Sequence, residues 1–477
     1  MTSVDFKSEI MYAQQVFFFK ESNVNELNAV SVLDGRYSRL VEELRDIFSE
    51  YGLIKHRVFI EIEWLKFILN DLELSPLSKD ETESVNSISF GFNRESSSLV
   101  KQIEKTTNHD VKAVEYYIKQ QLEDRGLGKI KEWVHFCCTS EDINNTSYAL
   151  MIQKGKKVAT ELSLELLSLL ESFGLKYKSI PMMSRTHGQP ATPTTVGKEF
   201  INFAARIKRE ILKLQNLEIE GKMNGATGNY SAHNFVQPNI NWAEKTEIFI
   251  REKLNLKQLP WTTQINNYHY ISEFYHTLIR LSSTVIDLDR DAWGYISINY
   301  FKQRTKKGEV GSSTMPHKVN PIDFENSEGN LGIGISMMEH LSVKLLNSRY
   351  QRDLTDSTVL RNTGAILGYY IIGLKNCIKG LNKLDLNEKA IADDLMNNPA
   401  LLAEPIQTAM RMFGEENPYE KLKELTRGHK IDIKTLENFV NSLKKVPEAQ
   451  KKRMCELTPS NYLGLAQELV DLYFSDK

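Results

Sequence analysis

The sequence is poor in cysteine and in net charge. It holds four cysteines in 477 residues; Cys137 and Cys138 are adjacent, and no two cysteines form a C-x-x-C pair. This pattern argues against a disulfide framework and a zinc site, and it fits a reducing compartment such as the cytoplasm. The 60 basic and 62 acidic residues nearly cancel, so no overall field attracts nucleic acid or a membrane surface. We expect a protein that binds neither.

Long apolar runs are also missing. No stretch approaches the roughly 18 uninterrupted apolar residues of a membrane helix. The apolar patch at residues 16–19 is too short to span a bilayer, Asp5 precedes it, and no arginine occurs before Arg36. These features argue against a secretory signal and against a mitochondrial transit peptide. We interpret residues 1–25 as an N-terminal extension.

Residues that break helices are scarce, because only 13 prolines and 25 glycines interrupt the chain. The long segments between them carry apolar residues at helical spacing rather than in the alternation of strands. We predict an all-α fold with a bundle of long helices. The alternative, surface helices of separate small domains, fits poorly with the length of the apolar stripes. Four stripes stand out: Leu162, Leu166, Leu169, Leu170 and Phe173; Phe200, Phe203, Ala204, Ile207, Ile211 and Leu214; Leu278, Leu281, Val285 and Leu288; and Met338, Leu341 and Leu345.

The length of the chain predicts two to four domains. A polar, serine-rich stretch at 75–93 has the composition of a loop between helices, and a final set of shorter helices follows a charged break near Leu386. The predicted parts are an N-terminal extension (1–25), an N-terminal helical domain (26–127), a central helix-bundle domain (128–381) and a C-terminal helical domain (382–477).

The most informative segment is 311–321, which reads Gly-Ser-Ser-Thr-Met-Pro-His-Lys-Val-Asn-Pro. Two prolines, three hydroxyl residues and a glycine exclude a regular helix and favour a polar loop with free backbone N–H donors. Lys318 adds a positive charge. Such a loop can hold a carboxylate, although an ordinary surface loop has a similar composition.

This segment resembles the signature loop of the fumarase/aspartase superfamily. Continued through residues 322–330, it is similar to the adenylosuccinate lyase branch of that superfamily in its bacterial form. Segments 106–115, 138–144 and 184–193 match the same branch, and the likeness runs from about Asn28 to the C-terminal end. The resemblance implies three helical domains with a long central helix bundle.

The reaction of this family explains why such residues are needed. In a β-elimination, a proton leaves the carbon next to a carboxylate while an amine nitrogen leaves the adjacent carbon. A hydrogen-bond donor aimed at the carboxylate stabilises the developing charge by about 3 kcal/mol, and Lys318 and Asn320 suit that role. A histidine that titrates near pH 7 can protonate the nitrogen, which contributes about a hundred- to ten-thousand-fold. The resemblance implies Ser312 as the base, His187 as the acid and His109 as a further catalytic residue.

Substrate-binding residues follow from the same resemblance, position by position. Spacing alone does not separate Ser312 from Ser313 as the base, and His135 and His317 are not expected to be catalytic. Outside such motifs, an exposed arginine is best interpreted as a solvated charge and a lone histidine as a structural residue. A planar guanidinium group suits a phosphate, because it makes paired charged hydrogen bonds. The implied substrate-binding residues are Arg36, Tyr37, Asn108, Asp110, Thr139, Ser140, Gln264, Ser313, Lys318, Asn320, Asn326, Arg352, Ser357, Thr358 and Arg361.

The resemblance also implies an activity in purine nucleotide biosynthesis. Fumarate is expected to leave adenylosuccinate, giving AMP, and the succinyl-carboxamide imidazole ribotide SAICAR, giving AICAR. No metal and no organic cofactor is implied; the expected partners are these small-molecule substrates and further copies of the chain, in a homotetramer whose sites each draw on three subunits.

Two alternatives compete with this function. Argininosuccinate lyase, fumarase and aspartase share the serine loop but bind no nucleotide phosphate, so Arg36, Tyr37 and the segment 357–361 argue against them. A non-catalytic structural protein on the same scaffold is disfavoured, because Ser312 and His187 are both present.

Overall fold

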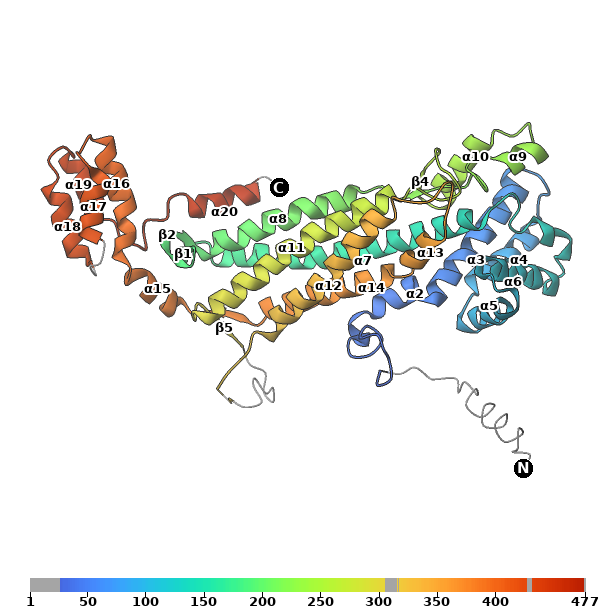
Figure 1. Cartoon of the computed structure of the whole chain (residues 1–477), viewed down its shortest axis with the longest axis horizontal. Coiled ribbons are helices and arrows are strands. Elements are labelled where there is room, and N and C mark those ends of the chain that lie inside the picture. Colours follow the sequence, from blue (N-terminus) through green and yellow to red (C-terminus); the bar gives the residue numbers. More distant parts are fainter. Residues whose placement is uncertain (1–25, 305–314, 316, 427–430, 476–477) are drawn as a thin grey trace, which may run out of the picture.

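The computed structural model of the chain describes residues 26–304, 315, 317–426 and 431–475. The molecule is elongated, and long helices run along its long axis (Figure 1). The N-terminal helices lie at one end of these long helices, and the helices of residues 388–455 lie at the other end (Figure 1). Among the described residues, no helix is long and apolar enough to cross a lipid bilayer.

The N-terminal helices pack around α3 (Glu50–Lys66), which is buried on most sides. Its residues Ile54, Val58 and Trp64 are at most 1% exposed, and α3 contacts α2, α4, α5 and α6. The expected loop at 75–93 is wrong: most of it is helix α4 (Lys79–Phe90), which begins at a capping box of Ser78 and Glu81 and buries Val85 and Ile88. The other elements of this part are η1 (Ser38–Leu40), α2 (Glu42–Phe48), η2 (Phe67–Asp71), α4 (Lys79–Phe90), α5 (Arg94–Thr107), α6 (Asp110–Asp124) and η3 (Gly128–Trp133).

Five long helices form the central bundle. They are α7 (Ser140–Lys176), α8 (Val196–Asn216), α11 (His269–Ser297), α12 (Ile322–Lys344) and α14 (Thr363–Leu381). Helix α12 packs against α11 and α14, α7 packs against α8 and α14, and α11 also contacts α8. The four predicted apolar stripes lie on these helices, and Leu166, Leu170, Phe203, Leu281 and Met338 are buried. The predicted all-α bundle is therefore confirmed.

Short strands join the long helices, which the sequence did not predict. Strands β1 (Pro181–Thr186) and β2 (Gln189–Thr195) form an antiparallel hairpin between α7 and α8. The other two sheets pair β3 (Glu220–Gly221) with β4 (Lys257–Gln258) in parallel and β5 (Phe301–Gln303) with β6 (Leu384–Leu386) in antiparallel. Short helices fill the remaining connections: α9 (Ser231–Val236), α10 (Trp242–Ile248), η4 (Phe249–Lys253) and α13 (Thr355–Leu360).

The last helices have a core of their own. Leu402, Ile406, Met410, Leu436 and Val440 are buried in a cluster that is separate from the main core. This separate core supports a C-terminal helical domain, and the domain boundaries given above stay predictions. The last helix, α20, returns to pack against α8 (Figure 1). The elements are α15 (Glu388–Met396), η5 (Pro399–Leu402), α16 (Ala403–Met412), α17 (Pro418–Thr426), α18 (Ile433–Ser442), α19 (Glu448–Cys455) and α20 (Ala466–Ser475).

Candidate active site

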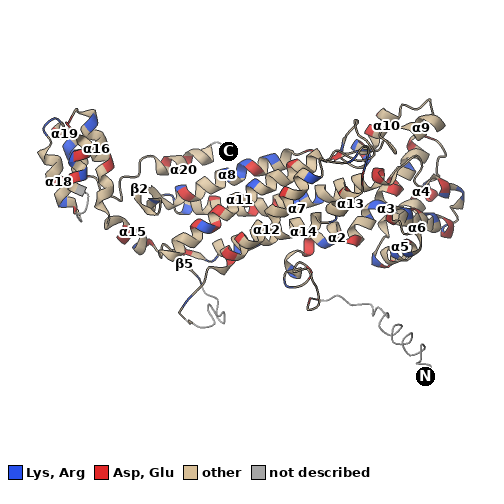
Figure 2. Cartoon of the chain, in the orientation of Figure 1, with Lys and Arg blue, Asp and Glu red and all other residues tan. Residues whose placement is uncertain are grey.

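Basic and acidic side chains are interspersed over all parts of the molecule (Figure 2). An anionic substrate must therefore be recognised by a local arrangement of groups. The predicted site residues that the structure describes fall into three such arrangements within the chain: one at the N-terminal end of the bundle, one in the β1–β2 hairpin, and one at the start of α12.

The first arrangement begins at the turn between α5 and α6. Asn108 ends α5 with a left-handed backbone (φ 49°), a conformation that asparagine tolerates better than most residues. His109 caps α6, and its Nδ1 accepts a hydrogen bond from the backbone N–H of Lys112 over 3.2 Å. Because Nδ1 is the acceptor, the neutral ring carries its proton on Nε2. The imidazole is about half exposed, at 52%, so it can reach a ligand.

Asp110, the first residue of α6, binds two arginines. Nη2 of the buried Arg57 donates to Oδ2 of Asp110 over 2.7 Å, and Nη2 of Arg361 donates to the same oxygen over 2.9 Å. Burial disfavours the carboxylate, but Arg57, the N–H of Val111 and Arg361 outweigh it and lower the pKa of Asp110. Arg361 also pairs with Glu50 over 2.8 Å. The predicted phosphate-binding arginine is thus held in place by two carboxylates.

Thr139 and Ser140 lie at the N-terminus of α7, and buried contacts of Asp142 hold this end of the helix in place. Thr139 and Asp142 form a capping box, and Asp142 makes a fully buried ion pair of 2.9 Å with Lys222. Oδ1 of Asp142 also accepts from the backbone N–H of Asn224. A helix N-terminus favours anions through its free N–H groups and its dipole, so Thr139 and Ser140 are suitably placed to bind a carboxylate.

Arg352 joins this arrangement through two partners. Its Nη1 donates to Oε1 of Gln264 over 3.1 Å, and its Nη2 lies 3.0 Å from Oε1 of Glu141. Burial raises the pKa of Glu141, although Arg352 and Asn144 oppose that shift. Glu141 was not among the predicted site residues. Its position next to Ser140 in a matching segment was the available signal, and its buried contact with Arg352 gives it an orienting role.

The remaining predicted residues of this end are on its surface. Ser357 and Thr358 belong to α13, and Arg36 and Tyr37 precede η1; Tyr37 and Ser357 are half-buried, whereas Arg36 and Thr358 are exposed. A pocket of about 330 Å³ adjoins Arg361. It is lined by Leu33, Asp34, Arg45, Phe48, Glu50, Gly364 and neighbouring residues. This volume lies at the lower limit of small-molecule sites, so the pocket can accept part of a nucleotide.

His187 lies at the opposite end of the bundle, in the turn of the β1–β2 hairpin. His187 and Gly188 are the two turn residues, with φ of 52° and 73°, as a two-residue turn of type I′ requires. The imidazole is exposed. Helix α7 separates this hairpin from Ser140; it has 37 residues, which corresponds to about 55 Å at 1.5 Å per residue. His187 and His109 of one protomer therefore cannot share a substrate.

The third arrangement precedes and begins α12. The backbone N–H of Lys318 donates to the carbonyl of Met315 over 3.0 Å, and Nε2 of Gln303 in β5 donates to the carbonyl of Val319 over 3.0 Å. Lys318 is exposed and Asn320 half-buried, and Asn326 is exposed on the second turn of α12. Ser312 and Ser313 lie outside the described residues.

The two histidines not expected to be catalytic have different surroundings. Nδ1 of His135 lies 2.6 Å from Oε1 of the buried Glu61, which is a structural use of the ring. His317 is exposed.

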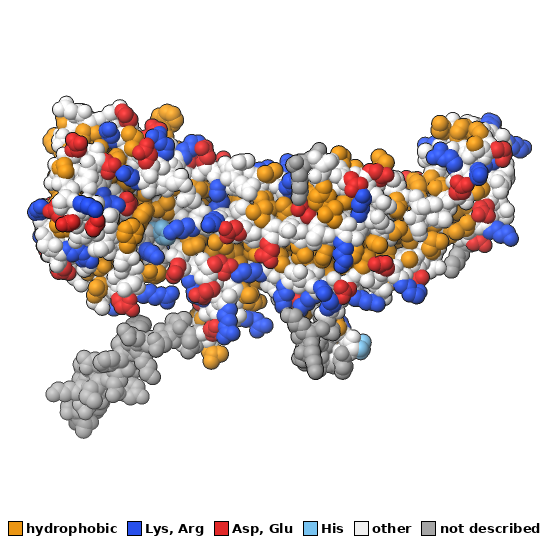
Figure 3. All heavy atoms as spheres, turned by 180° about the vertical axis from the view of Figure 1, so that it is seen from behind, with side chains coloured by type: hydrophobic (Ala, Val, Ile, Leu, Met, Phe, Trp, Pro, Cys, Tyr) orange, Lys and Arg blue, Asp and Glu red, His pale blue; other side chains and the backbone are white. Residues whose placement is uncertain are grey.

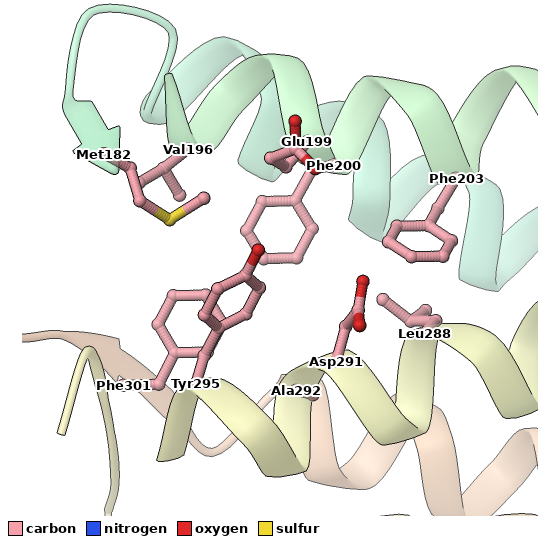
Figure 4. A pocket seen from close by; sticks show the side chains of 10 residues that line it. All are labelled: Met182, Val196, Glu199, Phe200, Phe203, Leu288, Asp291, Ala292, Tyr295 and Phe301. Atoms are coloured by element: carbon pink, nitrogen blue, oxygen red, sulfur yellow. The ribbon is translucent and has the colours of Figure 1, made fainter. Parts of the chain in front are cut away.

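An apolar cavity lies between α8 and α11, beside the base of the β1–β2 hairpin, where Met182 and Val196 line it (Figure 4). Phe200, Phe203 and Phe301 line it together with Glu199 and Asp291, and burial raises the pKa of Asp291 to about 6. Its volume is about 20 Å³. Since one water needs roughly 10–15 Å³ of such volume, this cavity is too small for a nucleotide.

Two family models match the chain. The model described as lyase matches residues 35–333, and the model described as adenylosuccinate lyase C-terminal matches residues 348–463. Over 453 residues the chain is 49% identical to the adenylosuccinate lyase of Haemophilus influenzae, 48% identical to that of Escherichia coli and 47% identical to that of Vibrio cholerae. Each alignment covers 94% of this chain and 99% of the relative.

Solved structures with the same fold are more distant in sequence. The 3-carboxy-cis,cis-muconate lactonizing enzyme of Pseudomonas putida has a TM-score of 0.73 at 19% identity, covering 91% of this chain and 96% of that one. A fumarate lyase of Mesorhizobium has a TM-score of 0.74 at 16% identity, covering 91% and 98%. At these identities the likeness concerns the fold alone.

Proposed function

The chain belongs to the adenylosuccinate lyase family and cleaves adenylosuccinate to AMP and fumarate, and on this premise we propose that Ser312 is the base of the reaction and His187 the acid. The observation that carries the function is the match to named adenylosuccinate lyases over 94% of the chain. The roles of single residues rest on the resemblance of their motifs and on the chemistry of their side chains.

The proposed elimination involves two proton transfers. One proton is taken from a carbon atom of the succinyl group, and one is given to the departing nitrogen. The deprotonated oxygen of Ser312 takes a proton from the carbon next to a succinyl carboxylate and becomes a hydroxyl, and the electron pair of that C–H bond forms the double bond of fumarate. The C–N bond breaks, and His187 gives its proton to the departing nitrogen, so AMP leaves with a neutral amine. Lys318 and Asn320 bind the carboxylate on which negative charge develops.

We propose that the N-terminal end of the bundle binds the rest of the substrate. Arg361 and Arg36 bind the phosphate, with Tyr37, Ser357 and Thr358 as hydroxyl donors. Exposed guanidinium groups and the pocket beside Arg361 support this assignment.

The succinyl group is assigned to the neighbouring turns. Thr139 and Ser140 at the N-terminus of α7 bind a succinyl carboxylate, while His109 assists catalysis; Asn108, Asp110, Gln264, Asn326 and Arg352 complete the binding site. The helix N-terminus and the half-exposed imidazole support these roles.

We propose that the protein is a homotetramer in which each active site draws on three subunits. Helix α7 keeps His187 about 55 Å from Ser140 within one chain, so residues of one site must come from different copies. The central helices offer apolar surface for such an assembly: orange side chains gather along the middle of the molecule in Figure 3. Exposed apolar residues on these helices include Leu175, Leu212, Trp293, Ile333 and Val343.

A second substrate and a location complete the proposal. SAICAR carries the same succinyl-amine group and a ribose phosphate, so the same residues can release fumarate from it and leave AICAR. We place the reaction in the cytoplasm, where purine nucleotides are made and where free cysteines stay reduced.

The function is tested with the purified protein and adenylosuccinate. We expect AMP and fumarate in equal amounts, followed by ultraviolet absorbance and chromatography, and a kcat that falls by about a hundred- to ten-thousand-fold in His187→Ala. Argininosuccinate in the same assay should give no fumarate. Absence of AMP from a folded protein would refute the function, and full activity of His187→Ala would refute only the assignment of the acid.

A further inference from the structure

A single carboxylate oxygen connects the segment that carries His187 with a segment that contacts the loop of Lys318 and Asn320. Arg185 precedes His187 by two residues, and its Nη2 donates to Oδ2 of Asp394 over 2.6 Å. The hydroxyl of Tyr300 donates to the same Oδ2 over 2.7 Å, and it also lies beside the guanidinium group of Arg185. The three side chains come from β1, from α15 and from the residue just before β5.

The two segments have different roles in the proposed site. The hairpin presents His187, whereas Gln303 of β5 donates to the carbonyl of Val319, between Lys318 and Asn320. The backbone of Tyr300 is also fixed to the C-terminal helices, because its carbonyl accepts from the backbone N–H of Asn387 over 2.8 Å. Asp394 thus holds the hairpin against the strand that supports the carboxylate-binding residues.

The hairpin needs such support. An isolated two-stranded hairpin is marginally stable in water, and its imidazole is exposed at the turn. A second tether lies on the other strand, where the hydroxyl of Thr192 donates to Glu404 of α16. Both tethers come from the C-terminal helices, which hold none of the predicted site residues.

An ordinary surface ion pair would be the simpler explanation, since the side chains of Arg185 and Asp394 are 27% and 33% exposed. Such pairs contribute little to stability. However, the same carboxylate oxygen also accepts from Tyr300, next to the strand that contacts the loop of Lys318 and Asn320, which a simple surface pair would not require. In addition, Nε of Arg185 is buried without a hydrogen-bond partner among the described residues, so the guanidinium group depends on the bond from its Nη2 to Asp394.

We propose that Asp394 is a positioning residue of the lyase reaction, which holds the hairpin so that His187 meets the departing nitrogen. This inference rests on the proposed role of His187 as the acid. It gives the C-terminal helices a part in catalysis without contact with the substrate.

The test compares Asp394→Asn with Asp393→Asn. Asp393 lies on the same helix and pairs with Lys389 at i,i+4, with 58% exposure, so its replacement is a matched control. Loss of positioning by about 1 Å lowers catalysis by up to about a hundred-fold. We therefore expect kcat of Asp394→Asn to fall by about ten- to a hundred-fold with KM changed by less than about three-fold, whereas Asp393→Asn keeps the activity of the parent enzyme.

Further variants separate positioning from stability. Tyr300→Phe removes only one donor and should lower kcat less than Asp394→Asn, and it keeps the test valid if Asp394→Asn does not fold. The effects of two substitutions are not additive when both act through the same group. If Asp394 acts through His187, adding Asp394→Asn to His187→Ala should therefore cause no further loss of the residual activity.

The outcomes are distinct. Any of four results would overturn the positioning role. They are an unchanged kcat in Asp394→Asn, an unchanged kcat in a folded Tyr300→Phe variant, an equal fall of kcat in the Asp393→Asn control, or a further fall of kcat when Asp394→Asn is added to His187→Ala. Full activity of His187→Ala would instead overturn the proposed acid, which is a separate failure.

Discussion

Arg361 and Asp110 are 251 residues apart in the chain, and Nη2 of Arg361 donates to Oδ2 of Asp110 over 2.9 Å. This contact joins the segment 357–361 to the turn that carries Asn108 and His109. Nη2 of the buried Arg57 donates a hydrogen bond to the same oxygen. One carboxylate oxygen therefore pairs with both an exposed arginine and a buried one.

Asp110→Asn should destabilise the protein by about 3 kcal/mol, because it leaves the cation of Arg57 buried without its carboxylate. The measurement is urea unfolding at a fixed protein concentration near pH 7. Asp287→Asn is the control, since Asp287 pairs with Arg206 at the surface, with 51% and 40% exposure, and should lose less than about 1 kcal/mol.

The pH dependence of this difference has a defined sign. The pKa of Asp110 is lowered in the folded state, so its stabilising effect is complete above the unfolded value of 3.8 and is lost as the pH falls through the folded value. The difference in the free energy of unfolding between the parent and Asp110→Asn should therefore decrease in that acidic range. If the difference in unfolding free energy between parent and Asp110→Asn is as small at pH 7 as at acidic pH, the role given to Asp110 is contradicted.

Arg361→Ala should weaken substrate binding while the chemical step is less affected. A charged hydrogen bond to phosphate is worth about 1.5–3 kcal/mol, so KM for adenylosuccinate should rise by roughly ten- to a hundred-fold. Arg251→Ala removes an arginine that is 58% exposed and pairs with Glu247 and Glu252, neither of which is a predicted site residue, and it should leave KM unchanged. Equal KM values for both variants would remove Arg361 from the binding site.

Asp289→Asn should stabilise the protein at neutral pH. Asp289 of α11 is 1% exposed, and burial raises its pKa from 3.8 to about 8, although Ser327 of α12 and Cys377 of α14 oppose the shift. The folded state therefore keeps a proton that the unfolded state loses, and stability falls between pH 3.8 and about 8, by at most about 1.4 kcal/mol per pH unit.

Urea unfolding of Asp289→Asn and the parent at pH 5, 6 and 7 checks this sign. The advantage of the variant should grow with pH, whereas Asp287→Asn should show no such trend. An advantage that stays constant from pH 5 to pH 7 would mean that the buried carboxyl group is already ionised at pH 5, and would contradict this prediction.

The architecture could be predicted from the sequence because it depends on repeated apolar spacing. Phe203, Leu281 and Met338 lie in the core as their helical stripes predicted. The β1–β2 hairpin was missed: its strands are short and contain Pro190 and Pro193, so period-two alternation gives no clear signal, and the left-handed backbone of His187 depends on the turn.

The geometry of the candidate site could be predicted less well from the sequence, because it depends on contacts between segments that are far apart in the chain. Motifs identified Asp110, Thr139 and Arg361 one by one, but their partners were not predictable. Glu141 and Arg57 act through burial and through pairs such as that between Glu141 and Arg352, and neither property follows from spacing. The sequence predicted only the part of α7 around Leu162–Phe173, and the fold shows that the helix runs from Ser140 to Lys176, with the β1–β2 hairpin of His187 at its far end.

A complementation experiment tests the shared site most directly. His187→Ala and His109→Ala each disable one end of the bundle, so mixed oligomers should contain some sites with both native histidines. If the two residues come from different chains, equal mixing makes about one quarter of the sites complete. We predict that activity after confirmed subunit exchange rises well above the sum of the two variants, toward a quarter of the parent activity. A fully exchanged mixture no more active than that sum would contradict the account.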